Sequence, residues 1–172
     1  MDNAVSVVLN ARTGMVVADI VEKDLGPEQL AYETMRMLEE YKRPIWGIED
    51  NDWGIATVRK AQDENYPRLY KRKTGRGSMQ IGWHTDRRSR RILWTDLREA
   101  VAARQLIIPN KMGLSQFYTV IRDPVHDSVG AMSGANDDYP VAVGIALQMP
   151  AVSTFVDVPS STRKNEGQLI AW

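Results

Sequence analysis

The chain has 172 residues, no cysteine and a formal net charge of zero. This length predicts one domain with a sizeable core. The lack of cysteine excludes disulfides and cysteine-bound zinc, and it fits a reducing compartment. No apolar run is long enough to span a bilayer and no signal peptide opens the chain, so we expect no membrane attachment.

The first 50 residues predict a hairpin, a helix and a buried strand. Apolar and β-branched residues at 4–9 and 15–21 flank a turn at 10–14. Gly26, Pro27 and Glu28 open a helix that ends before Pro44. A strand over 45–48 follows. This order predicts an α/β fold with a central mixed β-sheet flanked by helices.

Three carboxylates follow that strand within four positions, at Glu49, Asp50 and Asp52. Two carboxylates about 4 Å apart repel by roughly 4 kcal/mol at an effective dielectric near 20. A divalent cation would relieve this repulsion, so the stretch indicates a metal site. The alternative is a polar turn with solvated acids.

The middle of the chain predicts short elements around a basic loop. We expect a helix over 53–62, a strand over 68–70 and a mobile, glycine-containing loop over 71–78. Thr85 or Asp86 caps a further helix with an apolar stripe at Leu93, Leu97, Ala100 and Val101. A strand over 106–109, a helix marked by Leu114, Phe117, Tyr118 and Ile121, and a loop over 123–135 complete the segment.

Positive charge is concentrated in this middle segment. Residues 59–91 hold eleven of the 22 lysines and arginines but only three acids. Such a segment predicts contact with nucleic-acid phosphates without base recognition. The alternative is a solvated charged face, which is the usual role of a charge run. A phosphate-binding P-loop is excluded because its sequence pattern is absent.

A second acidic pair, Asp137 and Asp138, stands directly before Tyr139 and Pro140. Pro140 suits the first turn of a helix. Apolar residues then recur on one helical face at Ala142, Ile145, Ala146 and Met149. One of the two acids is expected to cap the helix, and a pair is more than a cap needs.

The order of these features resembles the ribonuclease H-like nuclease domain of bacteriophage terminase large subunits, the DNA-packaging motors. Four stretches carry the resemblance: residues 2–9, 48–51, 82–85 and 136–143. The second and fourth are similar to the family patterns "hydrophobic-acid-x-Asn" and "His-Asp-Asp-x-Val-x-Ala", with Asn136 in place of the family's histidine. The resemblance implies a ribonuclease H-like domain over 1–150, and it leaves 151–172 as an extension of unknown structure.

The resemblance also implies an activity, which is endonucleolytic cutting of concatemeric double-stranded viral DNA. Glu49, Asp138 and Asp2 would be catalytic, and together with Asp137 they would hold one or two Mg²⁺ or Mn²⁺ ions. Asp2 enters because the family's usual first catalytic aspartate precedes the position at which this chain begins. The basic residues expected along the DNA are Lys71, Arg72, Lys73, Arg76, Arg87 and Arg88.

Partners and location follow from the same resemblance. The partners would be double-stranded DNA, a packaging ATPase domain and a portal, in the cytoplasm of the host cell. The isolated domain is expected to be monomeric. Two other functions stay open: a DNA-binding or motor-docking module without catalysis, and another ribonuclease H-like nuclease such as a junction resolvase.

Overall fold

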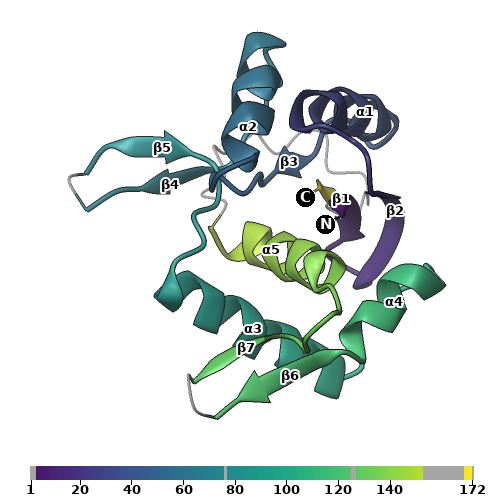
Figure 1. The fold of residues 1–172 in the computed structure, drawn as a ribbon. Helices are drawn as coiled ribbons and strands as arrows, with labels where there is room; N and C mark the ends of the chain where they lie inside the picture. The colour runs from purple at the N-terminus through teal and green to yellow at the C-terminus, as the bar shows by residue number, and fades with distance from the viewer. Residues whose placement is uncertain (1–2, 76, 125–126, 153–168, 172) are drawn as a thin grey trace.

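The computed structural model describes residues 3–75, 77–124, 127–152 and 169–171, with backbone only from residue 150 onward (Figure 1). The strands are β1 (Ala4–Asn10), β2 (Met15–Glu22), β3 (Ile45–Trp46), β4 (Lys71–Lys73), β5 (Met79–Ile81), β6 (Val120–Asp123), β7 (Ser128–Ala131) and β8 (Leu169–Ala171). The helices are α1 (Pro27–Glu40), α2 (Gly54–Asp63), α3 (Arg87–Ala102), α4 (Lys111–Phe117) and α5 (Asp138–Val152).

The largest sheet in the described part of the chain has the strand order β2-β1-β8-β3. β1 pairs antiparallel with β2 and with β8, and β8 pairs parallel with β3. The other two sheets are the antiparallel hairpins β4–β5 and β6–β7. The mixed α/β class predicted from the sequence is therefore confirmed.

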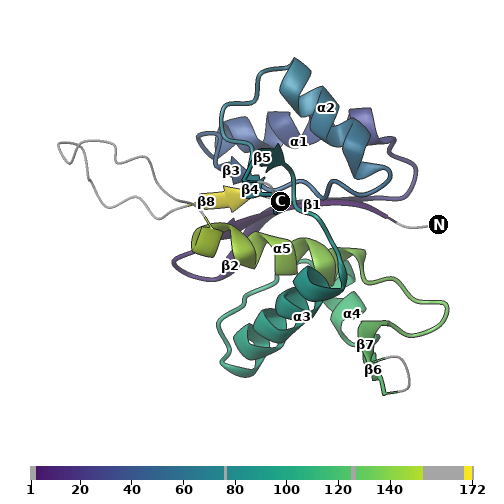
Figure 2. The same ribbon diagram turned by 90° about the vertical axis from the view of Figure 1, so that its left-hand side faces the viewer.

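Helices cover both faces of the largest sheet. Figure 2 shows α1 and α2 on one side and α5, backed by α3 and α4, on the other. The buried residues form two clusters that match these layers: one includes Ala31, Leu38 and Val58, and the other includes Leu93 and Ile145. Burying apolar area on both faces is what holds these short strands in place.

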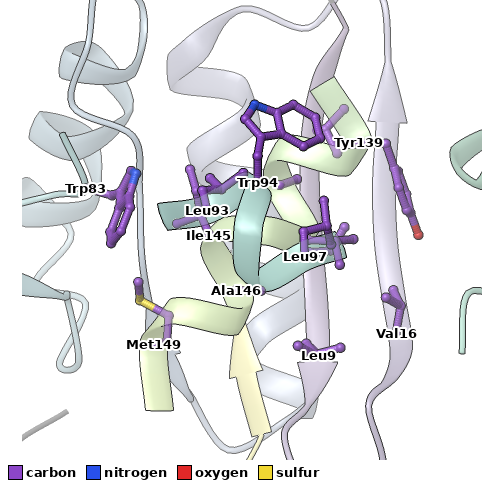
Figure 3. Packing of buried hydrophobic residues seen from close by; sticks show 14 of the residues in the cluster. Leu9, Val16, Trp83, Leu93, Trp94, Leu97, Tyr139, Ile145, Ala146 and Met149 are labelled. Atoms are coloured by element: carbon purple, nitrogen blue, oxygen red, sulfur yellow. The ribbon is translucent and has the colours of Figure 1, made fainter. Parts of the chain in front are cut away.

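Helix α5 forms the centre of the larger cluster. The predicted face of Ala142, Ile145, Ala146 and Met149 is confirmed, because all four are fully buried. Tyr139 and Val143 are also fully buried, so the helix is enclosed on nearly every side. Figure 3 shows Ile145, Ala146 and Met149 between Leu93 and Leu97 of α3 and Leu9 of β1.

The predicted hairpin, first helix and second helix are confirmed as β1–β2, α1 and α2. Helix α3 is capped by Asp86, whose Oδ1 accepts from the backbone N–H groups of Arg88 and Ser89. Ser89 Oγ in turn accepts from the Asp86 backbone N–H, which completes a capping box. Of the two predicted caps, Asp86 is the one used.

The predicted loops are wrong in two places. Residues 71–73 and 79–81 pair as the hairpin β4–β5, with a further hydrogen bond from Thr74 N to Ser78 O at 2.8 Å. Residues 120–123 and 128–131 pair as the hairpin β6–β7. The helix expected to reach Ile121 stops at Phe117, and Tyr118 and Ile121 are 81% and 51% exposed. Hairpins this short carry few residues, so their period-2 signal is weak.

Two smaller expectations are also wrong. Val101 is 50% exposed and does not belong to the buried stripe of α3. Residues 106–109 form no strand and contribute only the bridge from Ile107 to Met15.

The C-terminal strand β8 lies between β1 and β3, in a segment for which the sequence gives no structural signal. Leu9 and Ile45 both pair with Ile170, from opposite sides. Residues from the two ends of the chain therefore share one sheet. In the described residues, no helix is both long and apolar enough to cross a membrane.

Candidate functional site

The two acidic clusters lie at the same edge of the largest sheet. Because β1 is antiparallel to β8 and β8 is parallel to β3, β1 and β3 run in opposite directions. β3 therefore ends where β1 begins. Glu49 follows β3, and Asn3, which precedes β1, binds Asp138. One strand position separates β1 from β3, so the two strands lie about 10 Å apart.

Glu49 is held by its backbone and not by its side chain. It forms a parallel bridge with Trp83, made by Trp83 N to Ile48 O at 2.7 Å and Asp50 N to Trp83 O at 2.8 Å. Gly54 lies so close that a Cβ there would fall 1.8 Å from the Glu49 carbonyl oxygen. The Glu49 carboxylate makes no hydrogen bond or ion pair within the described residues.

Residues close to Glu49 in the chain, or to its bridge partner Trp83, carry buried polar atoms without partners among the described residues. Asn51 Oδ1, Thr85 Oγ1 and Trp83 Nε1 are buried and find no hydrogen-bond partner among the described residues. The amide nitrogen of Asn51 is used, since it donates to the Thr85 carbonyl at 2.9 Å. Buried polar groups normally have partners. This stretch therefore has unused hydrogen-bonding or ligand capacity.

The carboxylate that is tightly paired is Asp50, one residue along. Its side chain is only 7% exposed. Oδ2 lies 2.5 Å from Arg72 Nη1, and Oδ1 accepts a hydrogen bond at 2.9 Å from His84 Nδ1. Neighbouring residues in extended backbone point to opposite faces. Asp50 and His84 therefore lie on the face opposite to Glu49 and Trp83.

This pairing gives Arg72, one of the residues expected along the DNA, a contact within the fold. Its side chain is 21% exposed, and Nη1 also donates to the Gly82 carbonyl at 2.9 Å. Gly82 has φ +102°, and a Cβ there would lie 2.7 Å from Asp50 Cβ. Only glycine fits so close to Asp50. Arg72 thus anchors the β4–β5 hairpin to the body of the protein, and its expected contact with DNA stays a prediction.

Asp137 and Asp138 are each paired within the chain. Asp137 Oδ2 lies 3.1 Å from Arg90 Nη2. Asp138 Oδ2 accepts from the Asn3 backbone N–H at 2.8 Å, and from the side-chain amides of Asn3 and Asn136 at 3.1 Å each. Asn136 therefore orients Asp138 at the position where the resembled family has histidine. No hydrogen bond to Asp138 Oδ1 is found in the described part of the chain.

The oxygen donors at this edge suit a hard cation, but they do not form a complete set. Carboxylate and amide oxygens are the ligands that Mg²⁺ and Mn²⁺ prefer. Within the described residues, no group of three or more His, Cys, Asp or Glu side chains is arranged to hold a metal ion. The predicted third carboxylate, Asp2, lies outside the described residues.

The remaining basic residues lie on two elements. Lys71 and Lys73 are exposed on β4, and they face away from Arg72 because strand residues alternate. Arg87 and Arg88 are exposed in the first turn of α3. Cations there oppose the helix dipole, at a cost of about 0.3–1 kcal/mol each. Arg76 lies outside the described residues.

Comparison with known proteins adds no relative, because no protein-family model matches the chain and no curated protein matches it either. The site therefore has to be interpreted from its own chemistry.

Sequence reasoning missed the pairing of Asp50 with His84 and Arg72. The acidic stretch pointed to all three of its carboxylates without separating them. Side chains alternate between the two faces of an extended segment, so Glu49 and Asp50 are expected on opposite faces. Ile48 is buried and Gly82–Trp83 run beside this segment, as that alternation requires.

Proposed function

We propose that this chain is a metal-dependent endodeoxyribonuclease domain with a ribonuclease H-like fold, of the kind that cuts concatemeric DNA during viral packaging. The observation that carries the proposal is the shared sheet edge. Glu49 at the end of β3 and Asp138 at the start of α5 face one boundary of the sheet. The resemblance of residues 48–51 and 136–143 to the terminase patterns supports it independently.

In this proposal, different residues bind the metal ion, orient a ligand and balance charge. Glu49 and Asn51 Oδ1 would hold a cation on one side, and Asp138, with Asp2, would hold it on the other. Asn3 and Asn136 keep the Asp138 carboxylate in one orientation. Arg90 offsets the charge of Asp137. Bound Mg²⁺ or Mn²⁺ supplies activation of the attacking water and stabilisation of the leaving 3′ oxygen.

DNA would approach along the exposed basic residues. Lys71 and Lys73 stand on a hairpin that projects from the body of the protein in Figure 1. Arg87 and Arg88 open α3, which the chain reaches directly after Trp83, His84 and Thr85. These groups contact phosphates rather than bases, so binding would lack sequence preference.

One observation favours the second candidate, a DNA-binding module without catalysis. Arg90 pairs with Asp137 Oδ2, and Asn3 and Asn136 donate hydrogen bonds to Asp138 Oδ2. A carboxylate that already has partners is a weaker ligand, because a metal must first displace or share them. In that case the basic residues would bind DNA, and the acidic residues would have no catalytic role.

Plasmid cleavage separates the two candidates. With supercoiled DNA and 10 mM Mn²⁺, we expect nicking and linearisation by the wild type, and no cleavage by Glu49→Gln or Asp138→Asn. Asp52→Asn is the matched control, because Asp52 is an exposed acid three residues from Glu49. Retention of DNA binding by a wild type that does not cut would favour the second candidate.

Melting measurements test metal binding apart from catalysis. For a dissociation constant of about 1 mM and 10 mM Mn²⁺, the linkage term is roughly 1.4 kcal/mol. That corresponds to about 3–6 °C for a chain of this size. We expect the shift in wild type and Asp52→Asn and a smaller one in Glu49→Gln. Equal shifts in all three would count against Glu49 as a ligand.

A further inference from the structure

A large groove lies on the face of α3 that points away from α5. Its walls are α3, the connection over 104–108, α4 and the β6–β7 hairpin, which Figure 1 shows grouped on one side of the molecule. Its volume is about 1440 Å³. Small-molecule pockets measure about 300–1,000 Å³, so this groove suits a larger occupant. None of the acids at the sheet edge lines it.

The groove is strongly positive. Six arginines line it, at positions 87, 90, 91, 98, 104 and 122, against one acid, Asp127. Asp127 is shared by Arg91 at 3.2 Å and Arg122 at 2.9 Å. The side chains of Arg87, Arg98 and Arg104 make no hydrogen bond or ion pair within the described residues. The groove therefore has uncompensated guanidinium groups, which bind carboxylates strongly.

Its floor and part of its rim are apolar. Leu97 is 3% exposed, and Leu114 and Val120 are partly buried. Val101, Tyr118 and Ile121 line the same groove and are 50%, 81% and 51% exposed. Exposed apolar residues that adjoin one another and are rimmed by charge mark an interaction surface.

We propose that this groove binds an acidic amphipathic helix of a partner protein. Apolar side chains of the helix would fill the floor between α3 and the β6–β7 hairpin, and its carboxylates would meet Arg98 and Arg104. This is recognition of a helix in a groove.

The lining disfavours nucleic acid as the occupant. Single strands bind through aromatic side chains on which bases stack. Here Tyr118 is the exposed aromatic residue of the lining, while Trp94 is only 7% exposed and Phe117 is partly buried. The other apolar lining residues are aliphatic. The aliphatic floor matches leucine and isoleucine side chains better than bases. The proposal does not depend on the nuclease chemistry, since it uses neither Glu49 nor Asp138; it shares only Arg87 with the proposed DNA contacts.

A displayed library of random 16-residue peptides tests the proposal on the full chain. Peptides are selected on wild type and depleted on Arg98→Glu/Arg104→Glu. We expect the enriched peptides to carry net negative charge, with apolar residues at positions i, i+3 or i+4, and i+7. A synthetic, labelled copy of the leading peptide should lose at least tenfold in affinity on that double variant.

Two controls keep the outcome decisive. Arg59→Glu/Arg68→Glu reverses two exposed arginines that do not line the groove, and it should change the affinity less than twofold. Tyr118→Asp removes an exposed apolar contact without altering an arginine, and it should also weaken binding. This variant keeps the test valid if Arg98→Glu/Arg104→Glu does not fold. Enriched peptides that lack acids or the apolar period would overturn the proposal. So would displacement of the peptide by a 20-nucleotide single strand.

Discussion

Asp50 and Glu49 are adjacent carboxylates with opposite environments. Asp50 is a structural group: its side chain is 7% exposed and contacts Arg72 and His84. Glu49 has no such partner in the described part of the chain. Replacing a carboxylate that is paired within the fold lowers stability, whereas an unpaired carboxylate is available to bind a ligand. The two residues should therefore separate stability from function.

Replacing Asp50 by alanine should destabilise the fold. Breaking a buried ion pair costs about 3–5 kcal/mol, and we expect about 2–3 kcal/mol here because Arg72 and His84 keep access to water. Asp52→Asn should change stability by less than about 0.5 kcal/mol, because Asp52 is exposed and asparagine also tolerates the φ of +40° at this position. Urea denaturation of the three proteins measures both values. Equal midpoints for Asp50→Ala and wild type would contradict the anchoring role.

For individual residues, the sequence indicated which acidic stretches belong to the candidate site but not which partner each carboxylate has. Glu49 and Asp138 were selected by resemblance to a pattern. The partners of Asp50 come from residues 72 and 84, and those of Asp138 include Asn3, at the far end of the chain. Contacts between residues so far apart depend on the fold, so local sequence patterns do not contain them.

Among the elements, α3 depends on its first turn. Its cap, Asp86, has its carboxyl pKa lowered chiefly by the backbone N–H of Ser89, which favours the ionised form. A carboxyl group whose pKa is lower in the folded state stabilises that state above the unfolded pKa, and this contribution is lost as pH falls through the folded pKa. The cap therefore weakens below about pH 4.

The variant Asp86→Asn tests this dependence, because asparagine also caps helices but does not ionise. At neutral pH we expect melting temperatures close to those of wild type. Between pH 4 and pH 2, the melting temperature of wild type should fall more steeply than that of the variant. Parallel curves over this range would show that Asp86 ionisation does not contribute to the cap.

The β4–β5 hairpin makes a separate prediction about DNA. Lys71 and Lys73 share its exposed face, while Arg72 is turned toward Asp50. Each phosphate contact contributes about 0.9 to the slope of log affinity against log salt, so Lys71→Ala/Lys73→Ala should reduce that slope by about 1.8. Lys111→Ala, on α4, should leave the slope unchanged. An unchanged slope in the double variant would remove the hairpin from the interface.

Elements with a long repeating pattern could be predicted, and short ones could not. The apolar period of α5 extends over several turns, and Gly26 and Pro27 mark the start of α1; both helices are present. β4, with only Lys71–Lys73, has no apolar residue to reveal it. Its register is set by the Arg72–Asp50 contact and by the pairing of Lys71 with Ile81. Tertiary contacts override local preference in such strands.

For the molecule as a whole, β8 links the β1–β2 hairpin to β3. Residue 170 pairs with Leu9 of the β1–β2 hairpin on one side and with Ile45 on the other. Proline at this position removes a backbone N–H between two strands. We expect Ile170→Pro to cost about 1–3 kcal/mol, which corresponds to a fall of roughly 2–12 °C in melting temperature.

Ile170→Thr is the matched control, since it keeps the N–H group and a β-branched side chain. Thermal melts of the three proteins distinguish the backbone effect from the side-chain effect. A proline variant as stable as the threonine variant would show that β8 is not needed to hold β1 and β3 together.

The position of β8 also has a consequence for synthesis on the ribosome. Val8 pairs with Ala171, and at roughly 5–20 residues per second the two are made about 8–33 seconds apart. During that interval the nascent β1–β2 hairpin has an open edge, which another strand can pair with. A chaperone that shields this edge would raise the yield of folded chains, because β8 can insert beside β1 only after residue 171 has been made.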